Sequence, residues 1–393
     1  MRHPLPPKTR KDFDIAIICA LQLEADAVES FFDRFWDEEY GKAAGDNNAY
    51  RTGVIANHNV VLTYMPGIGK AHTARVAANF KSSFQAIRLA LIVGICGGVP
   101  EETGNGIYLG DIVISDEILT YDFGKMYPGG FQRKETVASS SLHSEVPAFL
   151  RKLRSPEGRR KLLGKTSHHL TELQAQSEGY HCPGRRQDQL FQPTYHHKHH
   201  GSSKCKRCKK NEPCKKAQES TCETLNCDPT KLIRRSRKNP NGIDIHFGRI
   251  ASGDIVMKSG VERDRIAKED TVIAFEMEGA GVCGSMPFIV IKGVCDYADS
   301  HKNKKWQKHT AGAAAACMRS LLEQWAPVDY GEDRIKDLLH EEPVCTPVAR
   351  SDIQSIRGDE GYYSQNNSDG SDGEITQGAT WFSLKNTQLL TYS

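Results

Sequence analysis

The sequence predicts an α/β fold, a three-layer α/β/α sandwich around a mixed, largely buried central sheet. Two observations lead to this prediction. Short, fully apolar runs that are typical of buried strands alternate with stretches of helical periodicity. Several of the apolar runs end directly in glycines or carboxylates, and ligand crevices of open α/β sheets form at such strand ends. With 393 residues, the chain can form one large domain and additional segments.

The first two predicted elements place a carboxylate at the end of a strand. Residues 13–21 have the pattern of a buried strand, and residues 24–35 that of the helix that follows it. Glu24 is therefore expected at the carboxyl end of this strand. A hairpin-like pair of strands comes next, at residues 50–55 and 60–64, joined by a short polar turn.

Two glycine-rich turns follow along the chain. The first contains Gly67 and Gly69 and leads into a helix over residues 70–84. The second, Gly94-Ile95-Cys96-Gly97-Gly98, ends the apolar strand at residues 89–93. Glycine lets the backbone approach a ligand closely, although such glycines also occur in ordinary tight turns.

Three further apolar strands and a closing helix complete the predicted core. They are expected at residues 112–114, 272–275 and 288–294, with the helix at 309–325. Glu276 and Glu278 follow the second of these strands, and Asp296 follows the third. Two carboxylates that face one crevice can divide the work, because one can hold a substrate hydroxyl while the other delivers a proton. The alternative is that these carboxylates only begin helices, where the dipole favours negative charge.

The motifs occur in a specific order along residues 13–138 and 241–326. They are an Ala-x-x-x-Glu start ending in Glu24, Gly67-Ile68-Gly69-Lys70, Gly94-Ile95-Cys96-Gly97-Gly98, Gly110-Asp111-Ile112-Val113-Ile114-Ser115-Asp116, Ser252-Gly253-Asp254, Glu276-Met277-Glu278 and Asp296. This series resembles the nucleoside phosphorylase/nucleosidase superfamily. The resemblance is closest to the methylthioadenosine/S-adenosylhomocysteine nucleosidases and to the phosphorylase-like domains of fungal immune receptors.

The resemblance implies that the domain breaks the N-glycosidic bond of a purine nucleoside. Asp296 matches the family's aspartate that donates a proton to the departing base, a role that needs surroundings favouring the protonated acid. Glu278 matches the residue that binds the ribose hydroxyls, and Met277 matches one that packs beneath the sugar. Glu24 matches the carboxylate that orients and deprotonates water. The other residues expected to line the substrate site are Gly67, Gly69, Gly94, Cys96, Gly97, Val256, Met257 and Glu276.

The residues around Glu24 favour hydrolysis over phosphorolysis. Phosphorylases need cations for phosphate, commonly an arginine just before the glycine motif of the central strand, and residues 91–94 contain none. Where the hexameric phosphorylases carry another phosphate-binding arginine, this chain has Glu24 and Asp26. Two alternatives stay open. One is a purine nucleoside phosphorylase that holds phosphate through backbone amides near Gly67 and Gly94, and the other is a non-catalytic nucleoside-binding sensor or adaptor.

The predicted substrate is an adenine nucleoside or nucleotide. The stretch at residues 255–258, Ile-Val-Met-Lys, lacks the aromatic residue that stacks on the base in the bacterial nucleosidases. Lys258, Lys302 and Lys305 form a cationic group that would suit the 5′-phosphates of AMP or ATP. The alternative is that these lysines belong to solvated loops.

A basic insertion rich in cysteine and histidine interrupts the family pattern at residues 139–240. It carries 22 lysines and arginines against 9 aspartates and glutamates, a net charge of +13. Residues 150–154 and 158–176 are expected to form basic, amphipathic helices. Five cysteines follow that suit a structural zinc ion, with reduced cysteines in a flexible loop as the alternative. They are Cys205, Cys208, Cys214, Cys222 and Cys227.

The sequence also limits the expected partners. The predicted catalysis needs no cofactor, and the small-molecule partner is the purine nucleoside or nucleotide itself. No aromatic platform accompanies the charges of the insertion, so a nucleic acid partner is not expected. No apolar stretch approaches the roughly 20 residues that cross a bilayer, so no membrane partner is expected. The resemblance implies a homo-oligomer.

Both ends of the chain are expected to be disordered. Residues 1–12 are proline-rich and lack the apolar run of a secretory signal. Residues 327–393 form an acidic tail, with 5 lysines and arginines against 12 aspartates and glutamates from residue 328 onwards, a net charge of −7. These features predict a cytoplasmic protein, with the nucleus as an alternative, in which the twelve cysteines stay mostly reduced.

Overall fold

The computed structural model describes residues 6–100, 106–134, 137–138, 145–200, 205–237, 242–302 and 304–326. The predicted acidic tail lies outside the described residues. Of the N-terminal segment that we expected to be disordered, residues 6–12 are described and include the 3-10 turn Arg10–Asp12, with Thr9 as its cap. Among the described residues, no helix is both long enough and apolar enough to cross a membrane.

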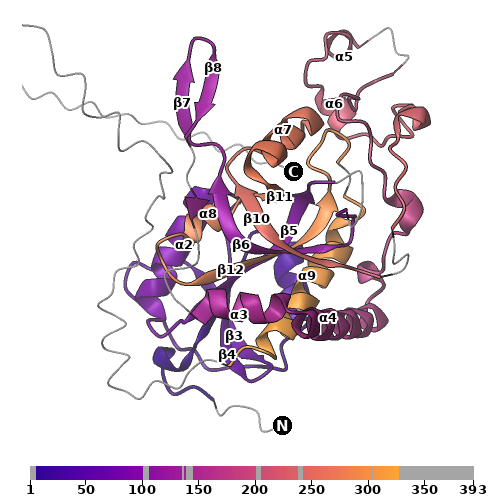
Figure 1. Ribbon diagram of the computed structural model, residues 1–393. Helices are drawn as coiled ribbons and strands as arrows, with labels where there is room; N and C mark the ends of the chain where they lie inside the picture. The colour runs from indigo at the N-terminus through magenta and orange to yellow at the C-terminus, as the bar shows by residue number, and fades with distance from the viewer. Residues whose placement is uncertain are drawn as a thin grey trace, which may run out of the picture. The chain divides into compact units, whose positions relative to one another are not determined.

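A ten-stranded mixed sheet forms the centre of the domain (Figure 1). In spatial order its strands are β11 (Val272–Glu276), β10 (Ile245–Ser252), β6 (Ile112–Thr120), β12 (Phe288–Asp296), β5 (Leu89–Gly98), β1 (Ile15–Cys19), β4 (His58–Tyr64), β3 (Ala49–Ile55) and β2 (Arg34–Phe35), with β9 (Val137–Ala138) beside β6. The central neighbours β12, β5, β1 and β4 run parallel, whereas β6 and β12 run antiparallel. Because β11 pairs with both β10 and β5, the sheet curls back on itself at this end.

Both faces of the sheet are covered, which confirms the predicted α/β/α sandwich. Along β1 the side chains alternate between two apolar cores, with Ile15 and Ile17 on one face and Ala16 and Ile18 on the other. The first face is covered by α1 (Gln22–Glu29), α3 (Glu145–Arg154), α4 (Pro156–Gln176) and α9 (Gln307–Leu322). The second face is covered by α2 (Lys70–Ser83) and α8 (Gly279–Val282). Every residue of β1 is buried, as expected for a strand between two layers.

Helix α1 is shorter than the sequence suggested. We expected a helix over residues 24–35, but α1 ends at Glu29 and the chain then forms the edge strand β2. The backbone amides of Asp33 and Trp36 donate to carbonyls of β3 at 2.8 and 3.0 Å. Pairing with the edge of the sheet therefore replaces the last helical turn, because it satisfies the same backbone groups.

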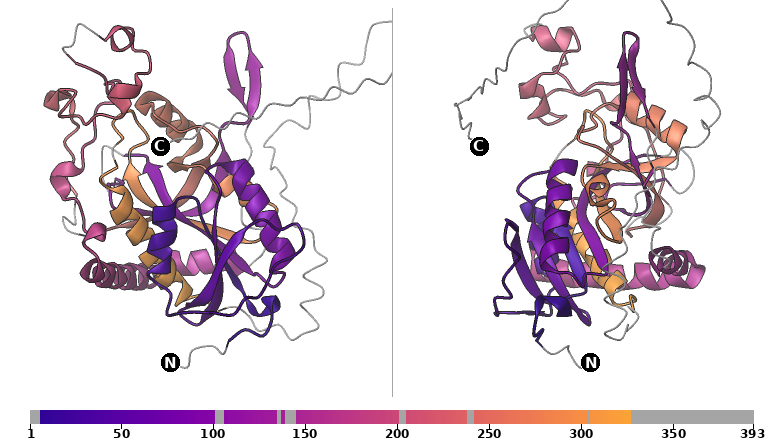
Figure 2. Two further views of the ribbon diagram at one scale, coloured as in Figure 1. Left: turned by 180° about the vertical axis from the view of Figure 1, so that it is seen from behind. Right: turned by 90° about the vertical axis from the view of Figure 1, so that its left-hand side faces the viewer.

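The helices predicted at the start of the insertion belong to the core of the domain. Buried leucines of α3 and α4, among them Leu153, Leu162 and Leu170, join the same apolar core as α9. Figure 2 shows α4 lying beside α9. The rest of the described insertion, residues 177–200 and 205–237, follows α4 and is called the outer insertion. The outer insertion contains η2 (Glu178–Tyr180), η3 (Arg185–Gln187), α5 (Lys206–Lys209), α6 (Lys215–Gln218) and η4 (Pro229–Lys231).

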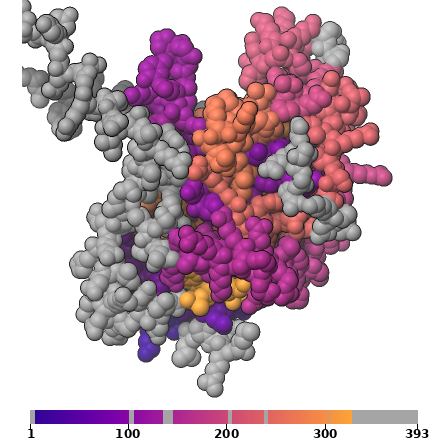
Figure 3. Space-filling view, in the orientation of Figure 1, coloured from indigo at the N-terminus to yellow at the C-terminus, as the bar shows by residue number. Residues whose placement is uncertain are grey.

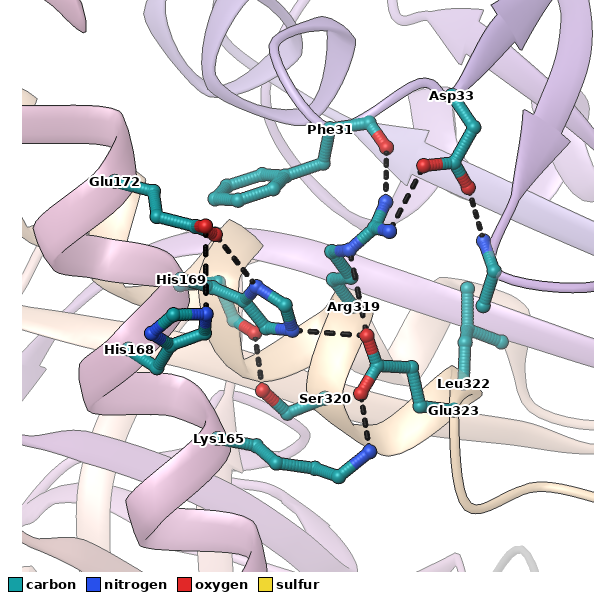
Figure 4. Close-up of polar contacts among 12 residues, drawn as sticks. Phe31, Asp33, Lys165, His168, His169, Glu172, Arg319, Ser320, Leu322 and Glu323 are labelled. Atoms are coloured by element: carbon teal, nitrogen blue, oxygen red, sulfur yellow. Dashed lines mark hydrogen bonds and ion pairs between the residues drawn. The ribbon is translucent and has the colours of Figure 1, made fainter. Parts of the chain in front are cut away.

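A polar cluster fixes α4 against the end of α9 (Figure 4). Glu323 accepts a hydrogen bond from His169 Nε2 at 2.9 Å and is ion-paired with Lys165, both from α4. Arg319 of α9 pairs with Asp33 at 2.8 Å. The hydrogen bond from His169, together with Lys165, holds the pKa of Glu323 at about 2 despite partial burial. The cluster therefore stabilises the packing of these helices through charge.

Two further elements lie beyond the sheet. β7 (Gly124–Tyr127) and β8 (Gly130–Arg133) form a separate hairpin that stands away from the central strands (Figure 1). α7 (Gly260–Asp270) connects β10 to β11. The N-cap Ser259 begins α7 by accepting a hydrogen bond from the amide of Glu262 at 3.2 Å.

Candidate active site

Glu24 is held at the carboxyl end of β1 by backbone amides. It lies in the first turn of α1 and is 2% exposed. Its Oε2 accepts hydrogen bonds from the amides of Ala20 and Leu21 at 3.0 and 2.9 Å, and its Oε1 accepts one from Ile95 at 2.8 Å. These bonds tie the first strand–helix turn to the glycine turn of β5. Glu24 thus lies where the sequence predicted it.

Gly94 makes room for this carboxylate. A Cβ at Gly94 would lie 2.2 Å from Glu24 Oε1, so any side chain there would push Glu24 away. Gly94 pairs across the sheet with Lys292 of β12, and paired residues face the same side. The missing side chain at Gly94 therefore brings Glu24 and Lys292 into one space.

Glu276, Glu278 and Lys292 complete a group that we call the buried cluster, together with Glu24. Lys292 is 1% exposed, and its Nζ lies 2.8 Å from Glu278 Oε2 and 3.6 Å from Glu276 Oε2. Glu276 also accepts hydrogen bonds from the amides of Glu278 and Gly279 at 3.0 Å each. Glu276 thereby fixes the start of α8, while Glu278 projects toward the lysine.

The charges of the buried cluster depend on one another. Burial raises the pKa of Glu24 and of Glu276, and Lys292 opposes this shift in both. Burial alone would lower the pKa of Lys292, but Glu278, Glu24 and Glu276 together raise it. Lys292 is therefore a permanent cation, and the carboxylates around it are held close to a positive charge.

Asp296 ends β12 in a different environment from the one we expected. Its Oδ1 accepts a hydrogen bond from the amide of Ala298 at 2.8 Å and lies 2.9 Å from Lys302 Nζ. The Cys295 thiol lies 3.5 Å from Oδ2. The role of acid predicted apolar or carboxylate-rich surroundings, and the structure instead places the ammonium of Lys302 beside this carboxyl group. The role of Asp296 as proton donor stays a prediction.

The segment from Asp296 to Lys302 follows a tight path that packing enforces. Ala298 has a positive φ of 52°, a conformation that costs free energy for a residue other than glycine. A Cβ at Gly97 would lie 2.9 Å from Asp296 Oδ1 and from the Ala298 Cβ, so only glycine fits there. The buried Arg263 donates to the carbonyl of Tyr297 at 2.7 Å. Asp296 is therefore presented by a rigid turn.

Cys96 connects the buried cluster with Asp296. Its thiol is 5% exposed, and burial raises its pKa, with Lys292, Asp296 and Glu276 contributing through their charges. Glu24 lies against Gly94 and Asp296 lies against Gly97, and both glycines belong to β5. The carboxylates that the sequence placed at three strand ends are therefore brought together around the end of this strand.

The first glycine turn lies beside the Ser-Gly-Asp motif. Gly69 has a positive φ of 106°, and a Cβ there would lie 2.8 Å from Asp254 Oδ1. The amide of Lys70 donates to the same oxygen at 2.8 Å, and the Lys70 side chain is ion-paired with Asp122 and Asp254. Gly67 lies two residues before Gly69 in the same turn. The carboxylates of Asp122 and Asp254 fix this turn through their contacts with Lys70.

Residues predicted to line the base and sugar differ in exposure. Met257 is buried in a small apolar core with Tyr121, Phe275 and Ala298, next to Asp296. Val256 is 45% exposed and lines a cavity of about 670 Å³ that Met257, Tyr121 and Ile266 also line. Met277 is half-buried between Glu276 and Glu278. Met257 and Val256 thus line an apolar surface of this cavity, and none of Glu24, Glu276, Glu278 and Asp296 is among its lining residues.

The three predicted phosphate-binding lysines have three different partners. Lys302 is paired with Asp296, Lys305 donates to Gln187 at 3.0 Å, and Lys258 donates to Gln218 at 3.3 Å. The contacts of Lys258 and Lys305 are with the outer insertion. The structure does not gather the three into one cationic group.

The five cysteines that suggested zinc are divided between two groups. Cys205, Cys208 and Cys214 lie with His199, and their ligand atoms are within 4.8 Å of one another. Cys222 and Cys227 lie at His197 instead, each with its Sγ 3.6 Å from His197 Nδ1. The sequence analysis did not assign these histidines. All five cysteines are free thiols.

Lys292 is the site residue that the sequence analysis passed over. Its signal was visible, because it is the one charged residue inside the apolar run of residues 288–294. A buried charge of this kind persists only when it is paired. Its partners come from three other elements, and the sequence alone did not indicate which ones they were.

Comparisons with known proteins identify the superfamily of the domain. Residues 14–170 match the family model described as the phosphorylase superfamily. A nucleotide-binding leucine-rich repeat (NLR)-like protein of Hyaloscypha variabilis is 30% identical over 325 residues, which are 81% of this chain. The chain spans 30% of the length of that relative.

Solved structures similar to the chain include a nucleosidase and a hydrolase. One is a 5′-methylthioadenosine/S-adenosylhomocysteine nucleosidase from Neisseria meningitidis, with 17% identity, a TM-score of 0.46, and 79% of this chain and 99% of that chain covered. The other is the futalosine hydrolase of Helicobacter pylori, with 15% identity, a TM-score of 0.46, and coverage of 80% and 99%. The match of residues 14–170 confirms the superfamily predicted from the motifs: the chain carries a domain of the phosphorylase superfamily.

Proposed function

We propose that the domain hydrolyses the N-glycosidic bond of a purine nucleoside or nucleotide, with adenine as the base, and releases the free base and the ribose moiety. The observation that carries this proposal is the position of Glu24. Its carboxylate fills the space beside Gly94 and accepts the amide hydrogen of Ile95 at 2.8 Å. The reaction proposed here needs no cofactor.

The position of Glu24 favours water over phosphate as the nucleophile. A phosphate held by the glycine turn of β5 would need the amide of Ile95, which Glu24 already uses. The negative charge of the phosphate would also be repelled by the Glu24 carboxylate. A carboxylate has about four acceptor sites, and three backbone amides fill three of them. The remaining site is suited to a water molecule, which Glu24 orients and deprotonates.

Glu278 binds the sugar, and Lys292 holds Glu278 in position. Among the described residues, Lys292 is the hydrogen-bond partner of the Glu278 side chain, through Oε2. The other oxygen of Glu278 is assigned to the ribose hydroxyls. Cleavage passes through an oxocarbenium-like state, and the carboxylates of the buried cluster stabilise its positive charge.

Asp296 delivers the proton to the departing base. Its Oδ1 is occupied by Ala298 and Lys302, so Oδ2 is the oxygen assigned to the base. The Lys302 ammonium lies 2.9 Å from Oδ1 and holds the carboxyl group in position. Met257 and the apolar residues around it give the base a dry wall, which strengthens hydrogen bonds at Asp296.

The test is product chromatography on the full chain with adenosine, methylthioadenosine, AMP and ATP, each with and without phosphate. Release of free base without phosphate, lost in Glu24→Gln, is the expected result. Glu24→Gln places an amide nitrogen toward backbone donors, so thermal melting of this variant must accompany the assay. Base release only with phosphate would replace hydrolysis by phosphorolysis. Absence of base in every reaction, with nucleoside binding retained, would indicate a sensor or adaptor.

Self-association is a further part of the proposal, carried by the superfamily alone. Sedimentation of the full chain measures it directly. A monomer over a wide concentration range would contradict it.

A further inference from the structure

Eight cysteine and histidine side chains of the described residues that could bind metal lie in two groups. The inner set consists of His199, Cys205, Cys208 and Cys214. The outer set consists of His197, Cys227 and His301, whose ligand atoms lie within 4.8 Å of one another, and of Cys222, which contacts His197. Seven of them belong to the outer insertion. The eighth, His301, belongs to the catalytic core and lies five residues after Asp296.

The inner set has the dimensions of a tetrahedral zinc site. Zinc binds sulfur at about 2.3 Å and imidazole nitrogen at about 2.0–2.1 Å, which places two sulfurs about 3.8 Å apart and nitrogen about 3.6 Å from sulfur. The Sγ atoms of Cys205 and Cys214 are 3.8 Å apart. His199 Nδ1 lies 3.2 Å from Cys208 Sγ and 3.9 Å from Cys214 Sγ.

The outer set has the same spacing around His197. Its Nδ1 lies 3.6 Å from the sulfurs of both Cys222 and Cys227. Its Nε2 is 2.9 Å from the carbonyl of Ser220, so Nδ1 is the nitrogen left for a metal. A hydrogen bond of this kind from the second ring nitrogen is typical of histidine ligands.

His301 supplies the fourth position of the outer set. Its ligand atom lies within 4.8 Å of those of His197 and Cys227. Only 3% of the His301 side chain is exposed, yet neither ring nitrogen has a hydrogen-bond partner. Asp299 Oδ1, at 4.0 Å from His301 Nδ1, is too far to supply one. A buried imidazole without a partner is costly, and a metal ion would satisfy it.

The apolar core of this region is too small to fix these side chains. It consists of Cys208, Ala217 and Leu225, with three more of the cysteines packed against it. The two helices beside it, α5 and α6, have four residues each. Regions with so little apolar burial need a metal or disulfides for a defined structure. The sulfur separation of 3.8 Å between Cys205 and Cys214 excludes a disulfide there, which needs about 2.05 Å.

We propose that each set binds one Zn²⁺, and that the outer ion links the insertion to the catalytic segment through His301. Thiolate and imidazole ligands in sets of four favour zinc among the divalent metals. The contacts around His301 agree with such a link. The amide of His197 donates to Ser300 Oγ at 3.0 Å, and the His301 ring stacks on Phe191 at 4.1 Å. Figure 3 shows the insertion, in pink, beside the orange part of the core.

The consequence for the site is positional. Lys302, the partner of Asp296, directly follows His301, so the outer ion fixes the end of the segment that presents the acid. His301 is thus a positioning residue and does not touch the substrate. This consequence rests on the proposed function, whereas zinc binding itself does not.

Metal analysis of the purified full chain by mass spectrometry tests the proposal. Two zinc ions per chain are expected, with one ion left in His301→Ala and one in Cys208→Ala. His301→Cys, which supplies another zinc ligand, should restore the second ion. Cys182→Ala is the matched control, since Cys182 is exposed and belongs to neither set. Two ions in His301→Ala, or fewer than one in the unchanged protein, would overturn the proposal.

A second readout separates this inference from the enzymatic one. We expect kcat/KM for base release to fall about 10- to 100-fold in His301→Ala and to recover in His301→Cys. If the chain releases no base at all, the number of zinc ions per chain still tests metal binding independently. If His301→Ala loses one zinc ion and keeps full activity, the link to the catalytic segment is wrong although the metal site is right.

Discussion

The buried cluster and the two cysteine–histidine sets both hold polar side chains in fixed positions, but their surroundings differ. Glu24, Glu278 and Lys292 lie between two large apolar cores on the faces of the sheet. The metal-binding sets lie beside a core of three buried residues. In the buried cluster, packing against these cores fixes the side-chain positions, and the charges are paired as a result. In the metal-binding sets, the ligands themselves must supply the order, and a bound ion is the means available to them.

The largest effect is expected at Asp296. Asp296→Asn removes the proton donor and should lower base release by about 10²- to 10⁴-fold, measured by chromatography. The free energy of unfolding should change little, because the amide keeps an oxygen for the bond from Ala298. Asp37→Asn, at an exposed aspartate, is the control and should behave like the unchanged protein. Activity within tenfold of normal would show that the proton comes from another group.

Lys292→Met tests how far packing alone holds the buried cluster. Loss of the cation leaves buried carboxylates without a partner, so the free energy of unfolding should fall by about 3–5 kcal/mol. Denaturant unfolding measures it, and Lys81→Met, at an exposed lysine of α2, is the control. Combining Lys292→Met with Glu278→Gln should recover part of the loss, because one unpaired charge is removed. Additive losses in the double variant would contradict the ion pair.

Zinc removal should loosen the insertion and leave the sheet and its helices folded. With a chelator present, we expect trypsin to cleave within residues 205–237 at least tenfold faster, because the small core no longer orders that stretch. The sheet and its helices should keep their melting transition. Equal resistance to trypsin with and without chelator would show that a metal ion does not order this stretch.

Glu323 tests a charge network that lies in the core but outside the site. Its pKa is held at about 2 in the folded protein, below the ordinary 4.5, so its contribution to stability is complete above pH 4.5. It is lost as the pH falls from about 4.5 to about 2. Glu323→Gln should therefore lower the free energy of unfolding at pH 7 by about 2–3 kcal/mol and have little effect near pH 2. Glu157→Gln, in an exposed pair with Arg160, should change nothing measurable.

Lys302→Met should give the smallest effect, a loss of kcat/KM of roughly tenfold or less, because the ammonium 2.9 Å from Asp296 Oδ1 no longer fixes that side chain. Lys305→Met, which removes a lysine that donates to Gln187, should leave kcat/KM unchanged. A loss in Lys302→Met as large as that expected for Asp296→Asn would mean that Lys302 itself supplies the proton.

Much of the fold could be predicted from the sequence, because the determinants were local. The apolar run of β12 and the carboxylate that ends it lie next to one another in the chain, so Asp296 could be placed at a strand end without the structure. The same holds for Glu24 and for the glycines of β5. The length of α1 could not be predicted, because its last turn competes with an edge of the sheet formed by later residues.

The partners of the site residues were the part that the sequence could not supply. Lys292 meets Glu24 only because β12 and β5 pair in a register that sets Lys292 opposite Gly94. His301 meets His197 across more than a hundred residues, and no local spacing indicates that pairing. The cysteines were visible as ligands, while their division between two sets depends on the path of the chain.

The short stretch His197-Lys198-His199 sends its first histidine to the outer set and its last to the inner set. If each set takes up an ion, the two ions share this stretch, so filling one set pre-orders a ligand of the other. The second ion would then bind more tightly than it does in a variant whose other set is broken. The supply of the metal would thus act on the catalytic segment more steeply than a single ion could.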